Sequence, residues 1–331
     1  MTRRDFLKRS TAAALAWPGL RAVGATPASA ADYPASPVRM IVPYPAGGAA
    51  DVVARIAAKH LSDQLGQQVF VDNRGGAGGT LGTEVAVRAA PDGYTLVMHT
   101  ISSAVLNRFL YRKVNLDVGE RFAPISQIGT VNQLLAVHPD VPAQNLQEFI
   151  ALLKANPGKY SYASPGHGTS PHVACERLFK VTHGVDAVHV PFPGGGQAVQ
   201  STVAGHTAIL HITLPLIAQH IKDGSLRALA LASSTRSPLF PDLPTLEEAG
   251  VPNHEVAFWV GLLVPAGTPS SRIDALHQHI INVQSLAEVK ERFASIGFEP
   301  VGSTPDEFAA HLKRESAEWA RVVREGRINI D

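Results

Sequence analysis

The chain has 331 residues, of which 45% are hydrophobic and 17% are charged, and its formal net charge is +1 with His neutral. Residues 1–30 carry five basic side chains and one acidic one, so 24 basic and 27 acidic residues lie beyond them and give a net charge of −3. That balance excludes a cationic surface for nucleic acid or for an anionic membrane. Cys175 is the single cysteine, which excludes a disulfide within one chain.

The first 30 residues have the pattern of an export signal. Residues 3–8 read RRDFLK, an alanine-rich stretch follows, and residues 28–30 read ASA. Paired arginines before a short apolar segment and a small-residue site are typical of a twin-arginine signal peptide. We therefore expect export to the periplasm with cleavage near Ala30. The alternative is a plain basic tail.

Short apolar runs alternate with helical patterns along most of the remaining chain. The predicted strands are residues 38–44, 68–72, 95–100, 134–138, 160–164, 187–192, 208–213, 227–232, 261–265 and 298–302. Many of these runs are continuously apolar, which is typical of strands that are covered on both faces. The pattern predicts α/β architecture with mostly parallel sheets flanked by helices.

Helical patterns separate these strands. Apolar residues recur at helical spacing within residues 53–61 and 146–153, and the chain ends in helical patterns over 273–293 and 305–324. Possible lobe boundaries lie near residues 129–132 and 255–259. We therefore predict lobe 1 from residues 31–130 plus 259–331, and lobe 2 from residues 131–258, with a ligand cleft between them.

Four turns rich in glycine or hydroxyl residues each follow a predicted strand and precede a predicted helix. They are residues 45–51 (PAGGAAD), 75–80 (GGAGGT), 164–170 (SPGHGTS) and 191–196 (PFPGGG). The first backbone N–H groups of a helix lack intrahelical partners and carry partial positive charge, so these turns suit an anion. Two turns fall in each predicted lobe, which favours a cleft that holds a carboxylate.

Candidate ligand-binding residues come from these turns and from the strand ends beside them. They are Tyr44, Ala46, Gly48, Ala49, Ala50, Asp51, Gly78, Thr100, Ser102, Ser103, His167, Gly168, Thr169, Ser170, Phe192, Gly194, Gly195 and Thr213. Two alternatives stay open: Asp51 acts as a helix cap, and residues 100–103 form a solvated loop.

Other site chemistries lack their patterns. There is no cysteine cluster, no His-x-x-x-His pair and no HExxH, so we expect no metal site. The run from Gly76 to Gly82 departs from GxGxxG at Leu81 and follows the second strand, which disfavours a dinucleotide cofactor. No GxSxG is present. We therefore expect no cofactor and no enzymatic activity, with an enzyme of unrecognised class as the less favoured alternative.

An ordered series of motifs carries a family resemblance. The motifs are residues 41–48 (IVPYPAGG), 71–74 (VDNR), 91–96 (PDGYTL), 166–172 (GHGTSPH), 189–192 (HVPF), 229–233 (LALAS), 241–250 (PDLPTLEEAG) and 265–269 (PAGTP). At these motifs the chain resembles the Bug-type solute-binding proteins of tripartite tricarboxylate transporters. The match runs from about Tyr33 to Val323.

The resemblance implies a two-lobe periplasmic binding protein fold of type II-like architecture. It implies capture of a small organic carboxylate through backbone amides and hydroxyl groups, and delivery to the membrane components of a transporter, by a protein that we expect to be a monomer. The alternative role is a carboxylate sensor that signals to a regulator. Neither the ligand nor the choice between these roles follows from the sequence.

The chain departs from the usual pattern of the family at four places. These are Ala49-Ala50 in the first turn, Phe192-Pro193 in the fourth, and His167 and His211. The first two changes remove hydroxyl groups, a phenol and a cation. We therefore expect a pocket that is less polar on one side and accepts an aromatic or alkyl carboxylate, whether a mono- or a dicarboxylate.

Overall fold

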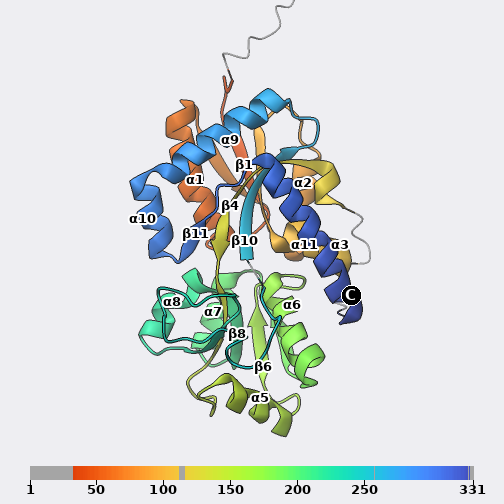
Figure 1. Cartoon of the computed structure of the whole chain (residues 1–331), viewed down its shortest axis with the longest axis vertical. Helices are drawn as coiled ribbons and strands as arrows, with labels where there is room; N and C mark the ends of the chain where they lie inside the picture. The colour runs from red at the N-terminus through yellow and green to blue at the C-terminus, as the bar shows by residue number, and fades with distance from the viewer. Residues whose placement is uncertain (1–32, 112–115, 257, 327, 329–331) are drawn as a thin grey trace, which may run out of the picture. The chain divides into compact units, whose positions relative to one another are not determined.

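The computed structural model describes residues 33–111, 116–256, 258–326 and 328. The predicted signal at residues 1–30 lies outside the described residues. From Pro34 onward the chain forms one compact unit. Its strands form a six-stranded sheet of order β11-β4-β10-β3-β1-β2 and a five-stranded sheet of order β7-β6-β8-β5-β9 (Figure 1). The predicted α/β fold with two sheets is confirmed.

The six-stranded sheet combines strands from both ends of the described chain. Its members are β1 (Val38–Val42), β2 (Val69–Asn73), β3 (Thr95–Thr100), β4 (Phe122–Val131), β10 (Phe258–Pro265) and β11 (Phe298–Pro300). All eight residues of β10 are buried, as its nearly continuous apolar sequence predicts. The sequence did not predict β4, in which Pro124 and Gly129 weaken the strand pattern.

The five-stranded sheet comes from the middle of the chain. Its members are β5 (Gln133–Val137), β6 (Ser161–Ser164), β7 (Val188–Pro191), β8 (Ile209–Thr213) and β9 (Arg227–Leu231). The boundaries that we predict for lobe 1 and lobe 2 remain a prediction, because both sheets belong to the one compact unit.

The expectation of mostly parallel sheets was wrong in detail. Among the pairings between described strands, four are parallel and five are antiparallel. Parallel neighbours need a crossover connection such as a helix. Strands β5 and β10 instead arrive from the other sheet, β5 through the single residue 132 and β10 through residues 232–257, and each inserts antiparallel between its neighbours.

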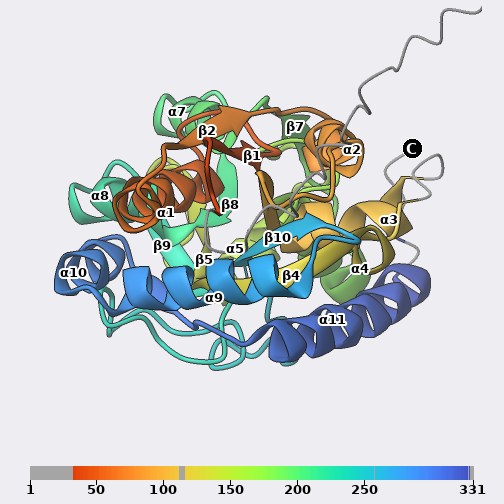
Figure 2. The ribbon, with the colours of Figure 1, turned by 90° about the horizontal axis from the view of Figure 1, so that it is seen from above.

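Helices connect the strands and cover the sheets. The helices are α1 (Ala49–Leu65), α2 (Thr80–Val87), α3 (Asn107–Leu110), α4 (Val118–Arg121), α5 (Leu146–Ala155), α6 (Ser170–Glu176), α7 (Gly195–Val203), α8 (Leu214–Lys222), α9 (Ser270–Ser285), α10 (Ala287–Ser295) and α11 (Pro305–Glu325). In Figure 2, α9 and α11 lie beside β4, and α1 lies beside β1 and β2. None of these helices is long and apolar enough to cross a membrane.

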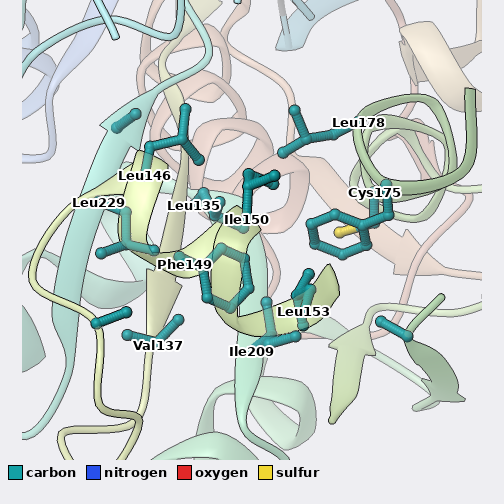
Figure 3. Close-up of a cluster of buried hydrophobic side chains, with 14 of the residues drawn as sticks. Leu135, Val137, Leu146, Phe149, Ile150, Leu153, Cys175, Leu178, Ile209 and Leu229 are labelled. Atoms are coloured by element: carbon teal, nitrogen blue, oxygen red, sulfur yellow. The ribbon is translucent and has the colours of Figure 1, made fainter. Parts of the chain in front are cut away.

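The core of the five-stranded sheet confirms the helical stripe predicted over residues 146–153. Leu146, Phe149, Ile150 and Leu153 of α5 are buried together with Cys175 of α6 (Figure 3). Burial of each such side chain stabilises the fold by about 1.5–3 kcal/mol. Cys175 is therefore a core residue, and burial raises the pKa of its thiol well above the ordinary value.

Candidate ligand-binding site

A cavity of about 910 Å³ lies where α1, α7 and α8 begin. Its wall combines the first turn, which follows β1, with residues of the five-stranded sheet and its helices. Eleven of the predicted ligand-binding residues line it: Tyr44, Ala46, Gly48, Ala49, Ala50, Ser102, Thr169, Phe192, Gly194, Gly195 and Thr213. The first, third and fourth turns therefore meet at this cavity, although they are far apart in the sequence.

Two of the helices present free amide groups at this cavity. Gly48 and Gly194 are the N-cap residues of α1 and α7, and neither helix has a side-chain cap. The first intrahelical hydrogen bonds run from Val52 N to Gly48 O and from Ala198 N to Gly194 O. The preceding N–H groups of each helix have no intrahelical partner, which is the arrangement that binds anions.

The start of α8 contributes a hydroxyl group rather than amides. The Leu214 amide donates to Asn132 O, and Pro215 has no N–H group. Thr213 is the N-cap residue and is only 2% exposed. Within the described part of the chain its Oγ1 atom has no hydrogen-bond partner. A buried hydroxyl without a partner is costly, so this group suits a ligand atom in the cavity.

His206 is the only basic side chain among the described residues that line the cavity. Among the described residues that line it, none is Lys, Arg, Asp or Glu. Part of the wall is apolar and includes Val190, Phe192, Leu216 and Phe258. Apart from His206, a charge on a ligand would therefore be stabilised by backbone dipoles and by neutral polar side chains.

Asp51 holds the first turn together and does not line the cavity. Its carboxylate accepts hydrogen bonds from Gly47 N at 2.9 Å, from Arg55 Nε at 3.0 Å and from Asn73 Nδ2 at 2.9 Å. Burial alone would raise the pKa of this carboxyl, but the hydrogen bonds from Arg55, Gly47 and Asn73 hold the pKa below its ordinary value. The structure thus supports the alternative in which Asp51 stabilises the helix start.

Thr100 and Ser103 support the cavity wall from behind. The hydroxyl group of Tyr44 lies 2.7 Å from Thr100 Oγ1, and Ser103 Oγ lies 2.9 Å from His99 Nδ1. Thr100 and Ser103 are buried and lie outside the wall of the cavity. Burial lowers the pKa of His99 to about 3, so this ring is neutral and fixes the position of Ser103.

Two hydrogen bonds join segments that flank different sheets. The Ser170 amide donates to Ser102 Oγ at 2.9 Å, and the Tyr111 hydroxyl donates to His167 O at 2.8 Å. Ser170 and Gly168 lie outside the cavity wall. The Ser170 amide, which the sequence assigns to a ligand, therefore has a protein partner in this arrangement.

A second cavity of about 760 Å³ adjoins the first and shares Tyr44, Phe192 and Thr169 with it. Two more predicted residues, Gly78 and His167, line this second space. Gly78 has φ +61°, and a Cβ atom there would lie 2.9 Å from His167 O, so only glycine fits this approach.

Three histidines meet beside the second cavity. One ring nitrogen each from His167, His172 and His189 lies within 4.8 Å of the others. Burial, together with the neighbouring imidazoles, lowers the pKa of His172 and of His189 to about 3. The sequence did not predict this cluster because His189 belongs to β7, which is distant from the third turn along the chain.

The geometry of the cluster suits packing better than a shared metal ion. The rings of His172 and His189 are stacked at 3.9 Å with an interplanar angle of 9°. A metal ion binds an imidazole nitrogen in the plane of its ring, so two parallel rings do not share one ion. Gly168 N also donates to His172 Nδ1 at 3.2 Å, which orders the third turn.

The profile of the family described as "Tripartite tricarboxylate transporter family receptor" matches residues 53–328. The chain belongs to this family. It is 39% identical over 302 residues to Protein BugT of Bordetella pertussis, which covers 91% of this chain and 92% of that protein. The predicted Bug-type relationship is confirmed, and this is a family of solute-binding proteins.

Solved structures of related proteins share the fold. The structure described as "R. palustris Rpa4515 with adipate" has a TM-score of 0.86 and 29% identity, and covers 90% of this chain and all of that chain. MatC from Rhodopseudomonas palustris with bound malate has a TM-score of 0.84 and 29% identity, and covers 88% of this chain and all of that chain.

Sequence reasoning missed one side of the first cavity. This side of the cavity is lined by α7 and by the residue that follows it, through Gln197, Gln200, Ser201 and Ala204. They recur at spacings of three and four residues, so they share one helix face. That spacing was the available signal, but a polar helix face is usually a solvated one. Phe258 also lines the cavity, whereas Trp259 is buried in the core.

Proposed function

We propose that this protein captures a small organic carboxylate in the 910 Å³ cavity and delivers it to the membrane components of a tripartite transporter. One observation carries the proposal: α1 and α7 both begin at the wall of this cavity, and neither helix has a side-chain cap. Among the described residues that line the cavity, none is Lys, Arg, Asp or Glu. The related proteins solved with adipate and with malate support a carboxylate as the ligand class.

In the proposed complex, a ligand carboxylate accepts hydrogen bonds from the amides of Ala49 and Ala50 at the start of α1. Hydrogen bonds to an ionised acceptor are about twice as strong as neutral ones. The amides of Gly195 and Gly196 and the hydroxyl of Thr213 complete the site from the other side. Asp51 contributes indirectly, because it holds the backbone of the first turn in place.

The protein acts in the periplasm in this proposal, and residues 1–30 direct it there by the twin-arginine route. Family membership supports the compartment. The paired arginines support the route. Binding without chemical conversion is the expected outcome, because the family consists of binding proteins.

Thermal unfolding tests the proposal directly. The purified protein, refolded to remove carried-over ligand, is melted in the presence of mono-, di- and aromatic carboxylates. A ligand at a hundred times its dissociation constant adds about 2.7 kcal/mol to the free energy of unfolding, so the midpoint rises clearly. If no carboxylate raises the midpoint while a nucleotide or a metal ion does, the proposed function is wrong.

A further inference from the structure

The two helix starts that suit an anion converge on one end of the cavity. The fourth turn packs against the first, and a Cβ atom at Gly194 would lie 3.6 Å from the Cβ atom of Pro45. Gly48 lies beside the same proline, since a Cβ atom there would be 3.7 Å from Pro45 O. The starts of α1 and α7 both line the cavity next to Pro45 and therefore border one shared volume of it.

An independent observation marks this end as a binding site. Thr213 is only 2% exposed and lines the cavity, and within residues 33–326 as described its Oγ1 atom lacks a hydrogen-bond partner. A hydroxyl can donate to a carboxylate oxygen, whereas water-excluded hydroxyls without a partner are rare in folded proteins. One carboxylate at the shared volume would satisfy this group.

Apart from His206, the rest of the cavity offers no basic side chain for a second negative charge among the described lining residues. Phe192, Leu216 and Phe258 give it an apolar wall, and Gln197 and Gln200 give it a neutral polar one. None of the described lining residues is Lys or Arg. A second carboxylate that does not reach His206 would lose its hydration without gaining a cation or a helix start, which is unfavourable.

We infer that this cavity selects a monocarboxylate with an apolar body of five or more carbon atoms over a dicarboxylate of the same length. The inference rests on the proposed function and adds to it the substrate class. The carboxylate lies between the starts of α1 and α7, and the apolar body lies against Phe192, Leu216 and Phe258. A volume of about 910 Å³ accommodates a body of this size.

Isothermal titration calorimetry with two matched pairs tests the inference. Hexanoate and adipate have the same number of carbon atoms and differ by the second carboxylate. Benzoate and benzene-1,4-dicarboxylate have the same aromatic ring and differ by the second carboxylate. We expect each monocarboxylate to bind at least tenfold more tightly than its partner. Equal or tighter binding of the dicarboxylates overturns the inference and leaves the proposed function standing. If the folded protein binds none of the four, the inference fails, and the melting assay with the wider carboxylate panel decides whether the proposed function fails as well.

A charge-introducing variant tests the location of the ligand body. Gln200 lies on the exposed face of α7, five residues beyond Gly195, which places it about 7.5 Å further along the helix. Gln200→Arg should improve the affinity for adipate relative to hexanoate at least tenfold, because the new guanidinium pairs with the second carboxylate.

Gln219→Arg is the matched control, since Gln219 is exposed on α8 and lies outside the cavity wall. It should leave the ratio of the two affinities unchanged. If Gln200→Arg also leaves the ratio unchanged while its melting midpoint shows a folded protein, the ligand body does not lie along α7 and the inference is overturned.

Discussion

At the scale of single residues, Asp51 determines the geometry of the first turn. Its carboxylate binds the Gly47 amide, the Arg55 side chain and the Asn73 side chain, and Asn73 in turn donates to Tyr44 O at 3.1 Å. The network fixes both the backbone before α1 and the end of β1. We therefore expect the free amides at the start of α1 to keep their position at the cavity only if these hydrogen bonds are intact.

Asp51→Asn tests the network. The substitution removes the charged acceptor of the Gly47, Arg55 and Asn73 donors. We therefore expect the free energy of unfolding to fall by about 1–3 kcal/mol. Asp63→Asn is the control, because Asp63 is exposed on the same helix, and an exposed site should change stability by less than about 0.5 kcal/mol. Urea unfolding at pH 7 measures both. Equal effects of the two variants would contradict the role of Asp51.

The same variant has a predictable pH dependence. The pKa of Asp51 in the folded protein lies below its ordinary value of 3.8, so the ionised carboxylate stabilises the fold at pH values above that value. This stabilisation is lost as the pH falls through the folded pKa. The stability difference between wild type and Asp51→Asn should therefore shrink between pH 5 and pH 3. A difference that stays constant or grows in acid would contradict the assignment.

The sequence predicted which turns form the cavity better than it predicted the role of each side chain. Glycine and proline mark the turns through local backbone preferences, and those preferences are visible in one chain segment. The hydrogen-bond partner of a hydroxyl group, in contrast, cannot be read from one chain segment. Ser102 and Ser170 both looked like ligand-binding residues, yet they form a hydrogen bond with each other across 68 positions of the sequence.

At the scale of elements, β10 and α11 meet at a glycine. A Cβ atom at Gly261 would lie 2.0 Å from Phe308 Cζ, so α11 packs directly on the backbone of β10. Trp259 of the same strand contacts Phe308 edge to face at 5.6 Å. Phe308 therefore occupies the volume that any larger residue at position 261 would need.

Gly261→Ala should destabilise the protein by about 1–3 kcal/mol, because the extra methyl group overpacks the contact with α11. Gly196→Ala provides a matched substitution in α7, where nothing lies within 4 Å of the added Cβ atom. Alanine is favoured over glycine in helices by about 0.5–1 kcal/mol, so this control should be neutral or stabilising. Thermal unfolding compares the two. A neutral Gly261→Ala would contradict the described contact.

All ten predicted strands are present in the structure, with ends that differ by up to three residues. The one strand that the sequence missed, β4, depends on its neighbours: it pairs with both β10 and β11, and the pairing with β10 contains register shifts. Long-range pairing outweighs the local effect of Pro124 and Gly129 there. The sequence also did not predict which strands pair antiparallel, because the direction of a strand depends on which sheet it joins.

At the scale of the whole described unit, the cavity depends on contacts between distant segments. The bonds from Ser170 to Ser102 and from Tyr111 to His167 join the residues around one sheet to those around the other. The four turns belong to four separate strand–helix connections, and only this packing makes them neighbours. The family resemblance implied the arrangement, whereas composition and periodicity alone predicted only the elements.

The crystal structure of the complex with the monocarboxylate that raises the melting midpoint most would test the central claim directly. We expect the ligand carboxylate within hydrogen-bond distance of the Ala49 and Ala50 amides, with Thr213 Oγ1 as a further donor and the apolar body beside Phe192. A carboxylate bound away from the start of α1, or held by a Lys or Arg side chain, would contradict it.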